Sequence, residues 1–173
     1  MKTQREKDLD SSAKEIFVKI VIDAWETQNS RVDKLLEELT DGQLEAATAA
    51  GKNSGVYLLG HLTAVSDGLL PILGLSERLY PQLEEAFLKN PEKSGAEKPS
   101  IADLKKYWRE VNTKIKKHFE AMSAEDWLGK HVAISSEDFA REPHRNKLNV
   151  LLSRTNHQSY HLGQLNYLRQ KQN

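Results

Sequence analysis

Apolar residues recur every three or four positions along four long stretches of this chain, and this period limits most strongly the folds that it can adopt. The spacing places apolar side chains on one stripe of an α-helix. No stretch shows the strict apolar–polar alternation that is typical of a half-buried strand. Amphipathic helices without a sheet bury their stripes only against each other. The sequence therefore predicts an all-α four-helix bundle of the up-and-down type.

The first predicted helix runs from about Ser12 to Leu39, and Thr40 and Gln43 beyond it have the spacing of a capping box. Residues 1–11 before it are polar and charged, and we expect them to form a mobile N-terminal segment. They lack the apolar run of a signal peptide, so none is expected. The apolar stripe of this helix comprises Phe17, Ile20, Val21, Ala24, Trp25, Val32, Leu35, Leu36 and Leu39.

The second predicted helix begins at Asn53 or Ser54, either of which can cap it, and reaches Pro71. The proline should kink or end this helix, because it lacks an amide donor and clashes with the preceding turn. Residues 73–99 then lose the helical pattern except at 82–88. A connection of this length is unusual between the second and third helices of a compact domain. We expect it to cover one end of the bundle or to form part of a site.

The third predicted helix is capped by Ser100, and its apolar residues are spaced three and four apart as far as Met122. Ser123 and Asp126 then begin a short turn. An irregular stretch leads to Asn146, after which the fourth predicted helix begins. The stripe of this last helix comprises Val150, His157, His161, Leu165 and Leu168.

The length and the residue types limit the class of protein. A chain of 173 residues fits one domain, predicted to span residues 1–173. The chain has no cysteine, which excludes disulfides, thiolate ligands and a cysteine nucleophile. This composition suits a reducing compartment, and we expect a cytoplasmic protein. The longest apolar stretches are too short and too interrupted to span a membrane, so no membrane partner is expected.

The charge balance disfavours nucleic acid as a partner. The 25 basic and 25 acidic side chains give a formal net charge of zero, so no global field steers the chain to DNA or anionic lipid. We therefore expect a small-molecule substrate and no nucleic acid. One basic cluster is interpreted as a solvated face of the third helix, and it comprises Lys105, Lys106, Arg109, Lys114, Lys116 and Lys117.

Three histidines are the strongest candidates for chemistry. His157 and His161 are four residues apart, so in a helix their Cβ atoms lie on one face about 6 Å apart and both rings can reach one ion. His61 lies in the apolar stripe of the second helix and should face the same interior. A divalent cation would satisfy three buried acceptor nitrogens at once. Three separate core histidines, each bonded to a carbonyl or water, are the open alternative.

The other histidines and two helical glycines carry weaker signals. We interpret His118 as a residue at the edge of the core, whereas His131 and His144 lie in predicted loops. Gly60 and Gly163 lie beside the candidate ligands inside helices, where glycine costs about 1 kcal/mol relative to alanine. They indicate either a close approach of helices around a site or a helix crossing without chemistry.

Two motifs, GHLTAV at residues 60–65 and NHQSYHLGQL at residues 156–165, are similar to motifs of the DinB/YfiT-like superfamily. The stretch LLEELTDGQLEAATAAGKNSGVYLLGHL also resembles the helix, turn and histidine-bearing helix of that family. The resemblance extends from about Ala13 to Arg169. It implies a four-helix bundle of the kind found in metalloenzymes.

The resemblance also implies a site and an activity. In this family His61, His157 and His161 would bind one divalent metal, usually zinc or nickel. Relatives often pair through their bundle faces, which implies a homodimer. Some relatives transfer low-molecular-weight thiols such as bacillithiol or mycothiol to electrophiles, and others isomerise maleylpyruvate with a thiol cofactor. The resemblance does not select among these reactions.

The chemistry at such a site stays open between three interpretations. Three nitrogen ligands leave one position, where a thiol would become a thiolate that attacks an electrophile. Water in that position would make a hydrolase. A metal-stabilised bundle without turnover, which acts through a dimer or a partner, belongs to a different class. Candidates to orient the ligands or relay a proton are Gln164, which is the strongest, and Tyr160, Gln28, Tyr57 and Asp67.

Overall fold

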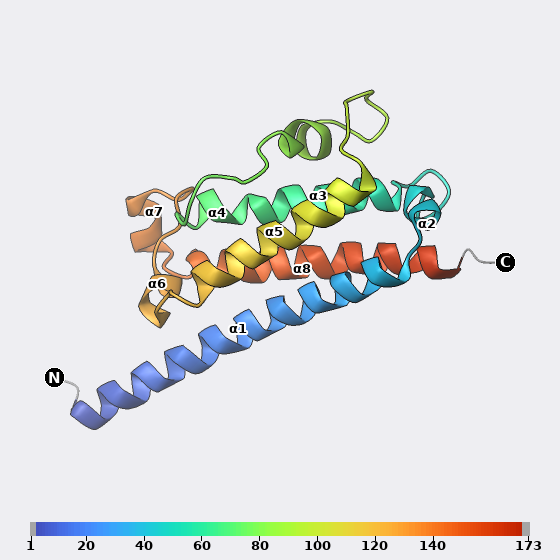
Figure 1. Cartoon of the computed structure of the whole chain (residues 1–173). Helices are drawn as coiled ribbons and strands as arrows, with labels where there is room; N and C mark the ends of the chain where they lie inside the picture. The colour runs from blue at the N-terminus through green and yellow to red at the C-terminus, as the bar shows by residue number, and fades with distance from the viewer. Residues whose placement is uncertain (1–2, 171–173) are drawn as a thin grey trace.

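The computed structural model describes residues 3–170, and all its regular structure is helical (Figure 1). The four long helices are α1 (Gln4–Glu38), α3 (Gly55–Asp67), α5 (Ile101–Phe119) and α8 (Lys147–Asn166). The shorter elements are α2 (Asp41–Glu45), α4 (Leu69–Ile72), the π-helical turn η1 (Glu85–Lys89), α6 (Ala124–Leu128), α7 (Ser136–Arg141) and the 3-10 turn η2 (Tyr167–Gln170). No β-strand occurs among residues 3–170, which confirms the all-α prediction.

Capping side chains set where the helices begin. The predicted capping box before α2 is present, because the Thr40 amide donates to Gln43 Oε1 at 2.9 Å and the Gln43 amide donates to Thr40 Oγ1 at 3.3 Å. Ser54 rather than Asn53 caps α3, since its hydroxyl accepts from the Tyr57 amide. Ser100 caps α5 as predicted, and Asn146, after which the fourth helix was expected to begin, caps α8.

The short helix α7 was not predicted, and the exposure of its residues explains why. Ser135 caps it by accepting from the Asp138 amide, yet none of its residues is buried. A helix that buries nothing carries no apolar stripe, so periodicity cannot detect it. The connection between α4 and α5, in contrast, is long and largely irregular as predicted, with only η1 as regular structure.

Polar pairs between helices reveal the direction of each one. Gln158 Nε2 donates to Asn29 Oδ1 at 2.8 Å, and Arg169 pairs with Glu38 further toward the C-terminal ends of both helices. Residue numbers thus rise together along α1 and α8, which run parallel. α3 runs opposite to α8, because Gly55 at its start lies against Leu168.

The helix α5 runs opposite to α1, which corrects the predicted up-and-down order. Lys116 pairs with Glu26 at 3.3 Å, whereas Trp108 Nε1 donates to Asp33 at 2.7 Å, so residue numbers fall along α5 as they rise along α1. Consequently α3 and α5 run parallel and pack against each other (Figure 1). Strict alternation fails at this step because the long 73–100 connection carries the chain back before α5 begins.

The N-terminal part of α1 differs from its prediction. The helix begins at Gln4 rather than near Ser12, so part of the segment 1–11 that is predicted to be mobile is helical, while residues 1–2 lie outside the described residues. Phe17 and Ile20, which the stripe places in the core, are 66% and 58% exposed. Val18 between them is buried in the core, so Phe17 and Ile20 lie on faces of α1 that turn away from it. The N-terminal end of α1 extends past the other long helices (Figure 1).

The core consists of two clusters of buried side chains. One gathers at the α2 and η1 side of the molecule and includes Leu35, Phe87 and Trp108. The other lies toward α6 and includes Trp25 and Trp127. Within residues 3–170, no helix combines the length and the apolar character that crossing a bilayer requires.

Candidate metal centre

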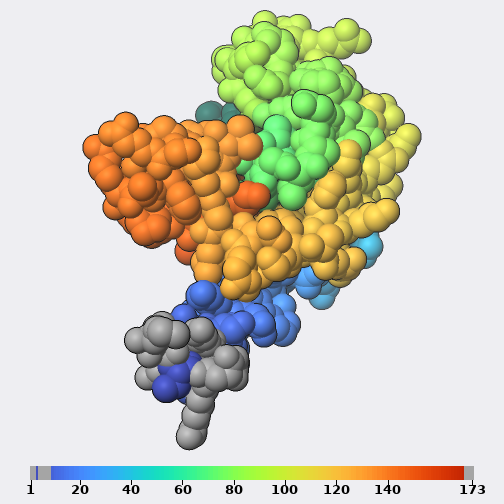
Figure 2. All heavy atoms as spheres, turned by 90° about the vertical axis from the view of Figure 1, so that its left-hand side faces the viewer, coloured from blue at the N-terminus to red at the C-terminus, as the bar shows by residue number. Residues whose placement is uncertain are grey.

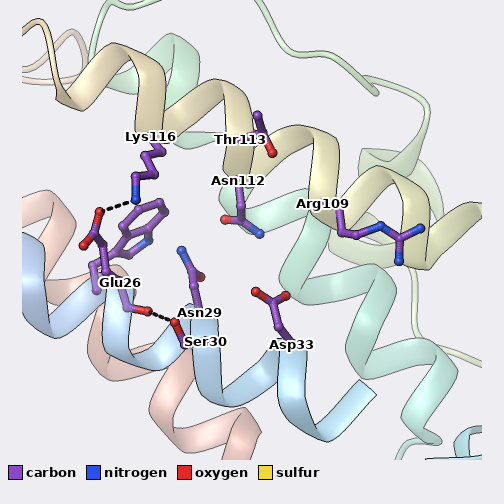
Figure 3. A pocket seen from close by; sticks show the side chains of 9 residues that line it. Glu26, Asn29, Ser30, Asp33, Arg109, Asn112, Thr113 and Lys116 are labelled. Carbon is purple, nitrogen blue, oxygen red and sulfur yellow. Dashed lines mark hydrogen bonds and ion pairs between the residues drawn. The ribbon is translucent and has the colours of Figure 1, made fainter. Parts of the chain in front are cut away.

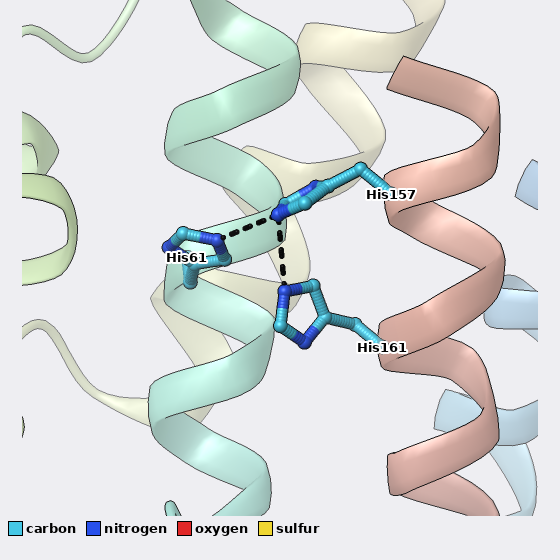
Figure 4. Close-up of side chains that lie close together, drawn as sticks. All are labelled: His61, His157 and His161. Carbon is cyan, nitrogen blue, oxygen red and sulfur yellow. Dashed lines mark hydrogen bonds between the residues drawn. The ribbon is translucent and has the colours of Figure 1, made fainter. Parts of the chain in front are cut away.

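Three histidines from two antiparallel helices converge where α3 faces α8. His61 comes from the middle of α3, and His157 and His161 come from adjacent turns of α8 (Figure 4). Each ring offers one nitrogen such that all three atoms lie within 4.8 Å of one another. All three side chains are partly buried. The structure thus brings together the three histidines that the sequence singles out, as a group that could hold one metal ion.

The ring of His61 is oriented by the connection between α4 and α5. Its Nδ1 lies 2.9 Å from the carbonyl oxygen of Phe87 in η1. A carbonyl only accepts, so Nδ1 carries the hydrogen and the Nε2 lone pair of the neutral ring faces the other histidines. The Tyr57 ring is stacked nearly parallel to it, with centroids 6.5 Å apart. A backbone acceptor and an aromatic neighbour therefore hold this ring in place.

Gly60 makes this orientation possible. A Cβ built on Gly60 would lie 2.2 Å from Cε1 of Phe87, a distance that real Cβ atoms do not show. The absence of a side chain therefore lets η1 approach α3 closely enough for the Phe87 carbonyl to reach His61. Gly163 has no comparable role, because nothing outside its own helix lies within 4 Å of a Cβ built there.

The ring of His161 is oriented by its own helix. Its Nδ1 lies 2.7 Å from Gln164 Oε1, and the Gln164 amide donates onward to the Tyr160 hydroxyl at 3.3 Å. Gln164 thus accepts from Nδ1–H, which leaves the Nε2 lone pair facing the cluster. Both Gln164 and Tyr160 lie beside the site as the sequence predicts, with Tyr160 largely exposed to solvent.

The ring of His157 shows that the cluster is not satisfied by protein groups alone. Its Nε2 lies 3.2 Å from His61 Nε2 and 3.1 Å from His161 Nε2. A single N–H there can be donated to only one of these two acceptors. Its buried Nδ1 has no hydrogen-bond partner among the described residues. A divalent cation would take all three Nε2 lone pairs, so the donor set fits a metal.

Burial and mutual repulsion keep two of the rings neutral. Burial is the main cause that lowers the pKa of His157 from 6.5 to about 4, followed by the nearby His161, His61 and Arg154. Burial also lowers the pKa of His161, partly opposed by the Gln164 hydrogen bond. Neutral imidazole is the form that binds metal ions, so the fold prepares these rings for binding at neutral pH.

A hollow of about 570 Å³ opens beside the cluster. Figure 2 views the end of the molecule at which residues around α7 (orange) and residues around α4 (green) lie on either side of a recess. We call this pocket the histidine hollow. It is lined by His61 and His157, by the two cations Arg78 and Arg154, by Gly68, and by the apolar Val65, Pro71, Ile72, Leu88, Val132 and Ala133.

A second, smaller hollow of about 270 Å³ borders the cluster at His161. His161, Gln164 and Tyr160 line it together with residues of the 48–53 turn and Leu58. The two hollows thus share the cluster, with His61 and His157 in the wall of one and His161 in the wall of the other, and the larger one has the size of a small-molecule site.

The remaining candidates lie elsewhere or have structural partners. Tyr57 donates its hydroxyl hydrogen to the Asn90 carbonyl at 2.7 Å, so this group ties α3 to the long connection rather than contacting a histidine nitrogen. Asp67 is fully buried and accepts from the Leu79 and Tyr80 amides, so it anchors the long connection. Gln28 on α1 makes no hydrogen bond to a histidine within the described part of the chain. None of His118, His131 and His144 joins the cluster.

Two residues near the cluster were missed by the sequence analysis. Phe87 contributes through its backbone carbonyl, so its residue type carried no signal. Arg154 lies one helical turn before His157, and that spacing alone could have placed it beside the site.

A separate hollow of about 320 Å³ lies between α1 and α5, and we call it the α1–α5 hollow (Figure 3). Lys116 pairs with Glu26 across it, and Asp33 accepts from the indole of Trp108 in the core beside it, whereas the buried Asn112 Oδ1 has no partner among the described residues. Asn29 at its base accepts from Gln158. It holds no histidine, and Arg109 lies at its open edge.

Comparisons with known proteins agree with this fold. The sequence pattern of the DinB superfamily matches residues 24–165. A solved structure, described as the conserved protein of locus from Enterococcus faecalis, has 16% sequence identity and a TM-score of 0.62. The match covers 88% of this chain and 94% of that one, and at this identity it indicates the fold alone. No curated protein matches the chain.

Proposed function

The chain belongs to the DinB superfamily, and we propose from this premise that it binds one divalent metal through His61, His157 and His161. The observation that carries the proposal is that one nitrogen from each of the three rings lies within 4.8 Å of the other two. In addition, the Nδ1–H groups of His61 and His161 are hydrogen-bonded to the Phe87 carbonyl and to Gln164. Zinc and nickel are among the ions that suit three nitrogen ligands.

The residues around the cluster suit a site that admits a small molecule. A bound divalent ion would supply Lewis acidity that favours the ionised form of a thiol or water in its remaining position. Phe87 and Gln164 keep the rings of His61 and His161 from rotating. Two hollows border the cluster, which leaves room for a thiol and an electrophile beside it.

We propose thiol transfer rather than hydrolysis as the reaction. The described residues that line the two hollows include no aspartate or glutamate, so no carboxylate is placed to act as a general base toward water. Once ionised, a thiol attacks an electrophile without further help from a base. The electrophile would enter through the histidine hollow, whose wall is largely apolar.

The wider organisation follows from the same premise. We propose that α1, α3, α5 and α8 form a four-helix bundle within one domain, with α1 and α8 parallel and both opposed to α3 and α5. The exposed apolar side chains Ile16, Phe17 and Ile20 on α1 support a homodimer that covers them. The absence of cysteine supports a cytoplasmic location.

Elemental analysis of protein purified without chelator tests the metal site. We expect one zinc or nickel per chain, and no stoichiometric metal in His61→Ala, His157→Ala or His161→Ala. His118→Ala is the matched control, because His118 lies outside the cluster and should leave the metal content unchanged. One-to-one metal in any of the three variants, or its loss in the control, would contradict the site.

A thiol-conjugation assay tests the reaction. Low-molecular-weight thiols would be mixed with a chromogenic electrophile and with metal-loaded protein, metal-free protein or the His157→Ala variant. We expect product formation above the uncatalysed rate only with metal-loaded wild-type protein. Turnover that needs no thiol would instead indicate hydrolysis.

A further inference from the structure

Arg154 is a cation without a partner beside the candidate metal centre. It lies one turn before His157 on α8, and both side chains line the histidine hollow. The side chain is partly buried, yet it makes no hydrogen bond or ion pair with any residue in the described part of the chain. A guanidinium presents five N–H donors that favour carboxylate or phosphate acceptors. Arg154 therefore brings unused donors to the hollow.

The second arginine of the histidine hollow shows what a structural arginine looks like in this protein. Arg78 donates to the Ala64 carbonyl at 2.9 Å and pairs with Glu84 at 3.5 Å. These contacts tie the long connection to α3 and neutralise the charge. No such contacts engage Arg154, so a structural role does not account for its placement there.

The rest of the histidine hollow indicates what the part of a ligand away from Arg154 should be. Apolar side chains form much of its wall, among them Ile72, Leu88 and Val132. No acidic side chain among its described lining residues would repel an anion or occupy the guanidinium. Figure 2 shows that the recess opens to solvent between the residues around α4 and those around α7. A ligand that matches this hollow has an apolar body and one anionic group.

We propose that the histidine hollow binds a small organic carboxylate, whose carboxylate group is held by Arg154 and whose apolar body lies against the Ile72–Leu88–Val132 wall. This deepens the proposed function, on which it rests for the role of the hollow as the electrophile's site. It narrows the substrate to an anionic electrophile and makes Arg154 a residue that determines specificity. Neutral electrophiles of the same size would bind less tightly, because the guanidinium would stay unpaired.

Binding of a matched pair of probes tests the proposal without turnover. Hexanoate and hexanamide have the same apolar chain and differ in charge, and calorimetry would measure both against zinc-loaded full-length protein. We expect hexanoate to bind about tenfold or more tightly than hexanamide, as a charge-assisted hydrogen bond implies. Arg154→Gln should remove most of this preference and Arg154→Lys should keep part of it.

Arg109→Gln is the control for loss of one positive charge. This arginine lies at the edge of the α1–α5 hollow, so the variant should keep the full preference for hexanoate. An undiminished preference in Arg154→Gln would overturn the proposal, since the metal or Arg78 would then hold the carboxylate. Equal binding of the two probes by wild-type protein would also overturn it.

The same samples separate this inference from the metal proposal. Zinc content is measured before each titration, and the probes are also titrated into zinc-free protein. Protein that binds no zinc but prefers hexanoate through Arg154 would refute the metal site and keep the carboxylate site. Protein that binds zinc in a one-to-one ratio and shows no preference would refute only the carboxylate site.

Discussion

The histidine hollow and the α1–α5 hollow are both lined by polar side chains, but these side chains differ in how far they are paired with other protein groups. In the α1–α5 hollow opposite partners meet, as Lys116 meets Glu26 at 3.3 Å and the Trp108 indole donates to Asp33 at 2.7 Å. At the histidine cluster three like nitrogens face one another, with separations of 3.1 and 3.2 Å for two of the pairs. The charged groups Glu26, Lys116 and Asp33 of the first hollow have partners within the protein, although the buried Asn112 Oδ1 has none among the described residues. The Nε2 atoms of the histidine cluster face only one another.

This difference separates polar groups that support the fold from polar groups that await a ligand. Paired groups stabilise helix packing and gain nothing from a metal. Converging acceptor nitrogens are costly because one N–H cannot serve all of them, and a cation would relieve that cost. The partly buried guanidinium of Arg154 has donors that an anion could accept from.

Zinc should stabilise the protein through one hollow only. At a free zinc concentration about a thousandfold above Kd, binding to the native state adds about 4 kcal/mol to the free energy of unfolding. We expect this gain in wild-type protein and in Asp33→Ala, which changes only the α1–α5 hollow. We expect none in His157→Ala. Denaturant titrations with and without zinc measure the effect, and equal gains in all three proteins would erase the contrast.

Gly60→Ala should disturb the histidine cluster through packing. The added Cβ would overlap the Phe87 ring, so we expect overpacking to lower the free energy of unfolding by about 1–3 kcal/mol. The displaced Phe87 carbonyl would also release His61, so zinc affinity should fall. Gly42→Ala is the control, because nothing lies within 4 Å of a Cβ built at Gly42. Unchanged stability of Gly60→Ala would show that η1 approaches α3 less closely.

Gln164→Leu should weaken metal binding while the fold stays intact. The variant keeps the size of the side chain and removes the acceptor of His161 Nδ1–H. Loss of such an orienting group lowers metal affinity by about 10- to 100-fold. Competition with a chelator of known affinity measures this change. Tyr160→Phe should have little effect, because the hydroxyl acts only through Gln164.

The metal-free protein should lose stability in acid through protonation of His157. Because the pKa of His157 is lowered from 6.5 to about 4, above pH 6.5 the ring is neutral in both the folded and unfolded states and contributes nothing. As the pH falls from 6.5 to about 4, His157 is protonated in the unfolded state but not in the folded state, so the free energy of unfolding decreases. Below pH 4 the ring is protonated in both states, and the free energy of unfolding decreases no further through this group. Thermal unfolding of metal-free wild-type protein and His157→Ala across this range should show a smaller loss in the variant.

Gly163→Ala should have the smallest effect, and of opposite sign to Gly60→Ala. Space is free around a Cβ at this helical position, so alanine should raise the free energy of unfolding by about 0.5–1 kcal/mol. Zinc affinity should not change. Destabilisation would mean that Gly163 allows a second chain to pack closely against α8.

Much of the site could be read from the sequence because it lies on regular helices. The i, i+4 spacing of His157 and His161 fixes their common face, and the apolar stripe around His61 points that ring inward. Gln164 follows from the same helical geometry. The Phe87 carbonyl could not be found in this way, because a backbone atom has no residue-type signature and η1 belongs to the irregular connection.

Periodicity and capping residues by themselves determined that this protein is helical, where most of its long helices begin, and which three histidines share an interior. Local hydrogen bonds and helix geometry depend on neighbours in sequence, so a local pattern suffices for them. The tertiary structure was needed to show that α3 and α5 run parallel, that Phe17 and Ile20 on α1 are exposed, and that Arg154 has no partner in the described part of the chain. These features depend on which surfaces meet across long stretches of chain, and no local pattern encodes that choice.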